Sequence, residues 1–173
     1  MATKKTADSY ANIAALSVSE SVAGTLSTAK FNFPFSIMDK MAILISRIEY
    51  LFDTTLAQLN SSGDRVVAAL LASNSVVNID NQADPLIVDN YRAMRLDLGA
   101  AASGNIHLLP AVKDFSALPG GGILVAPAPL YGAVQSFGAG GVLSVWIKLF
   151  YTYMELSTDD YWQLVESRRI ISS

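Results

Sequence analysis

The chain has 173 residues and a net charge of −3, which fits one domain and argues against a protein that mainly neutralises nucleic-acid phosphate. It contains no cysteine, which excludes disulfides, thiolate metal sites and cysteine nucleophiles. Hydrophobic residues make up 51% and charged residues only 16%, so we expect part of the surface to be hidden in an assembly. A compact monomer with much small apolar surface is the alternative.

The start of the chain is mainly small and polar. Residues 1–12 are expected to form a flexible N-terminal arm, followed by a single domain over 13–173. Lys4 and Lys5 are candidate contacts for anionic lipid or nucleic acid, although two lysines in an arm are usually just solvated. There is no signal-peptide core and no run of eighteen apolar residues, so a soluble mature chain is expected.

Apolar alternation and short apolar runs predict roughly seven or eight extended segments. In chain order they cover residues 15–24, 30–37, 41–52, 65–72, 86–98, 106–112, 123–134 and 142–155. Pro34 indicates an edge or bulged strand. Residues 41–52 favour a strand over a helix through their Ile, Tyr and Phe content, whereas periodicity cannot decide between strand and helix for 65–72. Turn-rich stretches within 60–84 leave the strand count open.

Gly-rich segments at 99–104, 120–122 and 138–141 separate the later strands. Many strands, Gly- and Pro-rich connections and no β-α alternation predict an antiparallel sandwich or barrel. A helix over 158–169 is expected to close the chain, because Ser157 can cap it and acidic residues follow at its positive end.

The strand over 142–155 carries apolar residues on both faces. Trp146, Phe150 and Met154 make its second face partly apolar, and a strand that is apolar on both faces is covered on both sides. A helix or loop of the same chain and a neighbouring subunit are equally good candidates for this cover. In the second case Trp146, Phe150, Met154 and Trp162 are candidate subunit-interface residues.

Signatures of catalysis or metal binding are weak. His107 is the only histidine, and a structural or exposed role is favoured over that of a catalytic base. Four oxygen-bearing side chains suit calcium by type: Asp80, Asn81, Asp84 and Asp89. Their spacing does not match the twelve-residue calcium loop, so Asx turns are favoured. The glycines at 120–122 lack the Gly-Lys-Ser/Thr of a phosphate loop. We therefore expect no catalytic residue, metal, cofactor or small-molecule substrate.

Residues 146–169 combine a barrel-crossing strand, an LS-x-D-D turn and a short amphipathic helix, and this resembles the end of single-jelly-roll capsid proteins. The length and the order of segments look like the smaller of the two major capsid proteins of tailless, icosahedral, membrane-containing phages that infect Thermus. The resemblance implies an all-β fold: a single jelly-roll barrel, that is an antiparallel β-sandwich, with a short C-terminal helix. It implies a virion protein made in the host cytoplasm, whose partners are further copies of itself, a second, larger capsid protein and the internal viral membrane.

A structural capsid subunit without enzymatic activity is therefore the leading hypothesis, and no sequence-specific nucleic-acid binding is expected. A ligand-binding β-sandwich of the carbohydrate type is the alternative, with Tyr131, Trp146 or Trp162 as stacking platforms. An enzyme with a minimal carboxylate site ranks last, because no matched acid–base pair is visible, Asp159 and Asp160 being accounted for by the helix start.

Overall fold

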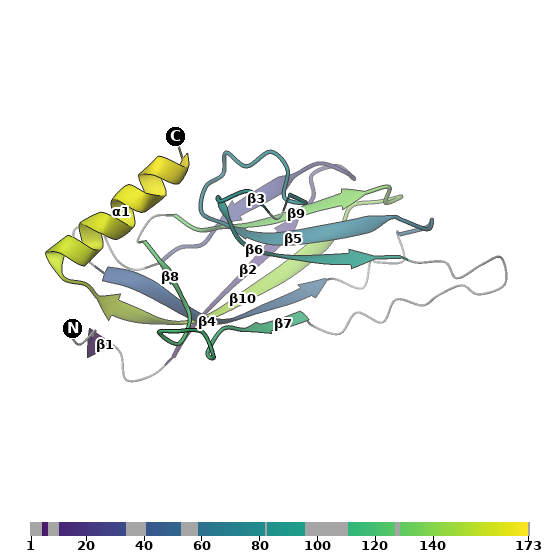
Figure 1. Cartoon of the computed structure of the whole chain (residues 1–173). Coiled ribbons are helices and arrows are strands. Elements are labelled where there is room, and N and C mark those ends of the chain that lie inside the picture. Colours follow the sequence, from purple (N-terminus) through teal and green to yellow (C-terminus); the bar gives the residue numbers. More distant parts are fainter. Residues whose placement is uncertain are drawn as a thin grey trace.

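The computed structural model describes residues 5–6, 11–33, 41–52, 59–81, 83–95, 111–126 and 129–172, with the backbone alone for 5–6 and 167–172. These residues form ten β-strands and one C-terminal helix, and the strands lie in two antiparallel sheets (Figure 1). The expected all-β class, an antiparallel sandwich followed by a short helix, is confirmed.

One sheet is built around β10 (Ser144–Glu155) and is called here the β10 sheet. β2 (Asn12–Ser19) and the two-residue β1 (Lys5–Thr6) pair with one edge of β10. β4 (Met41–Phe52) pairs with its other edge. The last strand therefore lies at the centre of its sheet, between the first long strand and the strand over 41–52.

An extra residue, Ser46, interrupts the pairing of β4 with β10, where the register shifts between Phe150 and Tyr151. The Ser46 hydroxyl donates a hydrogen bond to the Phe150 carbonyl oxygen at 3.2 Å. β7 (Ala111–Asp114) pairs with β4 on one side of this bulge and β8 (Ile123–Val125) on the other. The bulge thus divides the β10 sheet into two parts with different neighbours.

The second sheet, called the β5 sheet, has the order β3 (Ser27–Lys30), β9 (Tyr131–Phe137), β5 (Arg65–Leu71) and β6 (Ile87–Met94). Across both sheets the pairs are nested along the chain: β2 with β10, β3 with β9, β4 with β7 and β8, and β5 with β6. In this series each pair encloses the next, so the paired strands lie progressively closer together in the sequence.

Several strand predictions are confirmed. Residues 41–52 form a strand, as their composition indicated. Residues 65–72, for which periodicity left strand and helix open, contain the strand β5. The C-terminal helix α1 (Thr158–Ser172) begins at the predicted cap, where the Asp160 amide donates to the Ser157 hydroxyl at 3.2 Å. It runs three residues past the expected end at 169.

Three segments differ from prediction. The strand expected over 15–24 ends at Ser19. The single strand expected over 123–134 is wrong, because β8 ends at Val125 in the β10 sheet and β9 begins at Tyr131 in the β5 sheet. Pro129 lies in this crossing, and proline has no amide with which to continue a ladder. The strand expected over 30–37 ends at Lys30. Its residues 34–37 lie outside the described residues.

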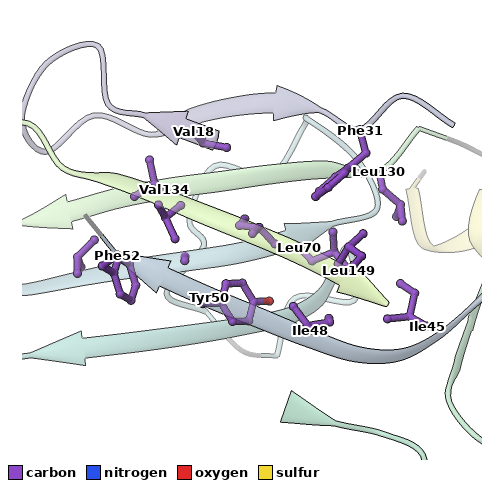
Figure 2. Close-up of a cluster of buried hydrophobic side chains, with 14 of the residues drawn as sticks. Val18, Phe31, Ile45, Ile48, Tyr50, Phe52, Leu70, Leu130, Val134 and Leu149 are labelled. Carbon is purple, nitrogen blue, oxygen red and sulfur yellow. The ribbon is translucent and has the colours of Figure 1, made fainter. Parts of the chain in front are cut away.

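The main core lies between the sheets. Figure 2 shows side chains from both sheets and from the residues beside them pointing toward one another: Val18, Phe31, Ile45, Ile48, Tyr50, Phe52, Leu70, Leu130, Val134 and Leu149. On β10, Val145, Ile147 and Leu149 are fully buried, as the alternation predicted. Each buried side chain of this size contributes about 1.5–3 kcal/mol to the free energy of unfolding.

A second apolar cluster lies on the outer side of the β5 sheet. The segment between β5 and β6 covers Val67, Ala69 and Leu71 with its buried Val76 and Ile79. Asp80 anchors this segment, because it forms ion pairs with both Arg65 and Arg92. The centre of the outer face of the β5 sheet is therefore covered within the chain.

Candidate interaction surface

Among the residues that the structure describes, those packed on the outer face of the β10 sheet close it at one end only. Beyond the Ser46 bulge, Tyr161 of α1 packs with Ala42, Met154 and Leu156, which are all buried. On the other side of the bulge the face carries four of the large apolar side chains that stay exposed: Ile13 (57%), Leu51 (44%), Val112 (50%) and Trp146 (51%). We call this uncovered part of the β10 sheet the open face.

The strand register places the side chains of the open face in three rows across β2, β10, β4 and β7. Val145, Ile147 and Leu149 point into the core, so the residues between them point outward. The rows are Ser17–Trp146–Leu51, then Ala15–Lys148–Glu49–Val112, then Ile13–Phe150–Arg47–Asp114. The first row is therefore mainly apolar, whereas the second and third rows each carry two charged side chains.

The charges of the open face neutralise one another. Arg47 forms an ion pair with Glu49, and the Lys148 Nζ atom lies 3.9 Å from Glu49 Oε2. Both cations also lie over the Phe150 ring, with Arg47 Cζ 5.0 Å and Lys148 Nζ 4.9 Å from its centroid. Phe150 is half-buried beneath them.

Asp114 completes this charge set at the end of its row. Hydrogen bonds from the Ser116 hydroxyl and amide, and then the charge of Arg47, lower the pKa of Asp114 below its ordinary value. Asp114 is therefore ionised at neutral pH. Two cations and two carboxylates give the open face no net charge.

The four candidate interface residues separate into distinct environments. Trp146 lies exposed at the centre of the first row, and Phe150 lies under two cations in the third. Met154 is only 5% exposed because α1 covers it, so it belongs to the interior of the chain rather than to its surface. Trp162 is 55% exposed on α1, beside Tyr161 at 5.6 Å between ring centroids. The second face of β10 is thus covered from within at its Met154 end, and Trp146 stays half exposed.

The other sequence candidates have ordinary structural partners or lie elsewhere. Lys5 pairs through its backbone with Glu155 in β1, while Lys4 and His107 lie outside the described residues. Residues 120–122 form part of the loop between β7 and β8. Tyr131 is half-buried and packs on the outer side of the β5 sheet.

The four side chains that suit calcium by type take part in turns, ion pairs and hydrogen bonds. Asn81 and Asp84 accept backbone amides two residues further on, at 3.2 and 2.9 Å, as in Asx turns. Asp80 forms ion pairs with Arg65 and Arg92. Asp89 accepts hydrogen bonds from the side chains of Tyr50 and Lys113. Within the described ranges, no group of three or more His, Cys, Asp or Glu side chains is placed to hold a metal.

A buried carboxylate at one end of the sandwich was missed by the sequence analysis. Glu20 is 5% exposed and accepts four hydrogen bonds, from the amides of Gly24, Ser136 and Leu143 and from the Ser136 hydroxyl, at 2.6–3.2 Å. It thereby joins the β2–β3 turn to β9 and to the β9–β10 turn. A single Glu among Ser, Val and Gly residues gives no local signal of this role.

A partly buried triad joins the two sheets at their β6 and β7 edges. The Tyr50 hydroxyl donates to Asp89 Oδ2 at 2.9 Å, and Lys113 Nζ donates to Asp89 Oδ1 at 2.7 Å. Burial, then the negative charge of Asp89 and the hydrogen bond to it, raise the pKa of Tyr50 well above its ordinary value of 10.0. Tyr50 therefore stays neutral and donates a hydrogen bond that links β4 to β6 across the two sheets.

No protein-family model and no curated protein matches the sequence significantly. In the part of the chain that the structure describes, no helix has the length and apolarity needed to cross a membrane. The fold and the surface together define an antiparallel β-sandwich with one sheet face closed by its own chain and one left open.

Proposed function

We propose that this protein is a structural subunit of an icosahedral viral capsid, built as a single jelly roll and acting by self-association and by packing with a second capsid protein. The larger partner and the internal membrane follow from the resemblance of residues 146–169 to capsid proteins of membrane-containing phages. The proposal assigns no enzymatic activity to the chain.

The nested strand pairing is the observation that carries this proposal. A jelly roll is a long antiparallel hairpin rolled into two facing four-stranded sheets, and such domains are common in viral capsids, lectins and cupins. The pairs β2·β10, β3·β9, β4·β7/β8 and β5·β6 have this order, with β1 as a short addition at one edge. This order favours the jelly roll over other antiparallel sandwiches.

The open face favours a subunit over the other functions that jelly rolls serve. Ile13, Leu51, Val112 and Trp146 share one sheet face and are 44–57% exposed. Large apolar side chains that stay exposed together on one sheet face favour an interaction site over a free exterior. Only 16% of the residues are charged, so the chain has few charged side chains with which to cover its surface. The open face is a place where apolar side chains stay exposed.

The carbohydrate-binding alternative receives less support from the arrangement of the aromatic residues. Trp146 lies on the outer side of the β10 sheet and Tyr131 on the outer side of the β5 sheet, so the sandwich separates them. Trp162 lies on α1. A glycan platform normally needs polar groups converging beside its aromatic ring, and the side chains across from Trp146 are Ser17 and Leu51.

Electron microscopy of virus particles purified from lysed host cells, with mass spectrometry of their shell proteins, tests the proposal. We expect peptides of this chain in the shell and density for an upright β-sandwich. Particles that lack the chain would contradict the capsid function. Retention on a glycan array that is lost on Trp146→Ala would support the alternative instead.

A further inference from the structure

We propose that the open face packs against the open face of a second copy of this chain. The two-fold axis of this dimer runs parallel to the strands, above the line between β10 and β4. The inference rests on the proposed function, because it assigns the surface through which a self-associating subunit would join its copy.

The first argument is the order of side chains within the rows. Rotation about this axis leaves the position of each row along the strands unchanged. It reverses the order of the side chains across the strands within each row. Lys148 then lies opposite Glu49 of the second copy, and Glu49 opposite its Lys148, because the two stand on neighbouring strands at one height. Each of these charged side chains thus faces one of the opposite sign on the other copy.

The neighbouring rows match in the same way. In the first row, Trp146 lies opposite Leu51 of the second copy, so that two half-exposed apolar side chains cover each other. In the third row, Phe150 lies opposite Arg47 of the second copy, which repeats the cation–π contact already present within the chain. All three central pairs are therefore favourable under one rotation, and each occurs twice.

The outer positions fit the same geometry. Ala15 lies opposite Val112 of the second copy in the middle row. Ile13 lies opposite Asp114 at the rim, where a carboxylate keeps its contact with water. Facing sheets pack about 10 Å apart, a distance that the large side chains in the centre can fill.

Within its own chain, Lys148 is only loosely paired. Lys148 is 42% exposed and lies 3.9 Å from Glu49 in its own chain, too far for a tight hydrogen-bonded pair. The outer side of the β5 sheet offers no comparable surface, because Val76 and Ile79 already cover it. α1 packs beyond the Ser46 bulge, at the other end of the strands. The β10 sheet therefore has one region free for face-to-face packing.

A charge exchange tests the geometry directly. The double variant Glu49→Lys/Lys148→Glu keeps one acid and one base at these positions, so it should fold and should dimerise with itself. A mixed dimer of this variant with the unchanged chain would place Lys opposite Lys and Glu opposite Glu, and we expect its affinity to be at least about tenfold weaker. Nitrogen-15 labelling of the variant gives the mixed dimer its own mass in native mass spectrometry, since the exchange leaves the composition unaltered.

A tryptophan pair provides the second measurement and its matched control. Trp146→Ala removes the apolar contact to Leu51 of the second copy and should weaken the dimer by about thirtyfold or more, as for a central interface tryptophan. Trp162→Ala removes an equally exposed tryptophan from α1 and should leave the dimer unchanged. Sedimentation velocity across a concentration series measures both.

The outcomes separate this inference from the proposed function. Free mixing of the exchanged and unchanged chains, or a Trp146→Ala protein that dimerises as well as the unchanged chain, would overturn the open-face geometry and leave a capsid subunit in place. A chain that stays monomeric at high concentration would overturn the geometry and also self-association. If the exchanged variant does not fold, the contrast between the two tryptophan variants decides.

Discussion

Glu20 shows how much of the end of this sandwich depends on a single side chain. Its carboxylate accepts hydrogen bonds from three amides and one hydroxyl, which belong to three separate segments. Charge-assisted bonds of this kind are about twice as strong as neutral ones, and a buried donor left without an acceptor costs about 1–3 kcal/mol. Glu20 therefore fixes the β2–β3 turn against β9 more firmly than apolar packing alone would.

Replacing Glu20 with Gln should lower the free energy of unfolding by about 3 kcal/mol. The Gln side chain has nearly the same volume, but its NH₂ group is a donor and would face amides and a hydroxyl that also donate. Urea unfolding followed by tryptophan fluorescence or circular dichroism measures the loss. Glu166→Gln on the exposed side of α1 is the control and should change stability by less than about 0.5 kcal/mol. Equal effects of the two substitutions would show that the four hydrogen bonds contribute nothing specific.

Tyr50 gives the fold a dependence on alkaline pH. Its pKa is raised in the folded state, so the stability that comes from its neutral hydroxyl is fully present below the unfolded pKa of about 10 and declines as pH rises above it. Tyr50→Phe removes this group together with its hydrogen bond to Asp89. At pH 7 the substitution should cost about 1–2 kcal/mol.

The difference in unfolding free energy between the unchanged protein and Tyr50→Phe should therefore shrink from pH 9 to pH 11. Urea titrations at several pH values measure it, and the shared titration of other groups cancels in the difference. A difference that stays constant over this range would mean that Tyr50 ionises as freely in the folded state as in the unfolded chain.

At the scale of elements, the Ser46 bulge decides where strands end and where surfaces change. β7 and β8 approach β4 on either side of it, and the loop between them comes very close to the β4 backbone. A Cβ atom on Gly122 would lie 2.4 Å from the carbonyl oxygen of Ile45. The close passage of β8 therefore requires glycine at this position for steric reasons.

Gly122→Ala should destabilise the fold by about 2 kcal/mol or more, because a backbone carbonyl within a strand cannot move aside without breaking its ladder. Gly132→Ala on β9 is the comparison, since a Cβ there would meet only the ends of the Leu16, Ile147 and Val18 side chains, which can shift. Its cost should be clearly smaller. Thermal unfolding ranks the two, and a larger effect at Gly132 would contradict the role given to the bulge.

The strands that could be predicted from sequence are those with one buried and one wet face. β2 and β10 alternate between buried or half-buried and more exposed residues over most of their length. β5 gave no usable period, because six of its seven residues are buried, half of them under the segment that carries Val76 and Ile79. Tertiary cover of this kind leaves no trace in the local pattern, and the same holds for the crossing at Pro129 between sheets.

The candidate surface was predictable only in part, for the same reason. Alternation placed Trp146 and Phe150 on the outer face of β10, as observed. It gave Met154 the same face but could not tell that α1 returns to cover it. Glu20 and the Tyr50–Asp89 contact join residues 116 and 39 positions apart, and no spacing rule reaches across those distances.

At the scale of the whole molecule, the nested order makes the fold depend on its last strand. β10 separates β2 from β4 and pairs with both along most of its length. Without it the β10 sheet has no centre, and the core between the sheets loses Val145, Ile147 and Leu149. Pairing of the first long strand with the last requires closure of nearly the whole chain, which is an entropically costly step.

Two truncations separate the contribution of β10 from that of α1. A chain ending at Leu143 should not fold, because it lacks the central strand, and should show neither a cooperative urea transition nor a strand-type circular dichroism spectrum. A chain ending at Ser157 keeps all strands and loses only α1, so it should keep both signals with a free energy of unfolding lower by roughly 3 kcal/mol, from the lost packing of Tyr161 on Ala42 and Met154. Cooperative unfolding of the shorter chain would mean that the remaining strands form a sandwich without β10, and the nested pairing would then not be what holds this molecule together.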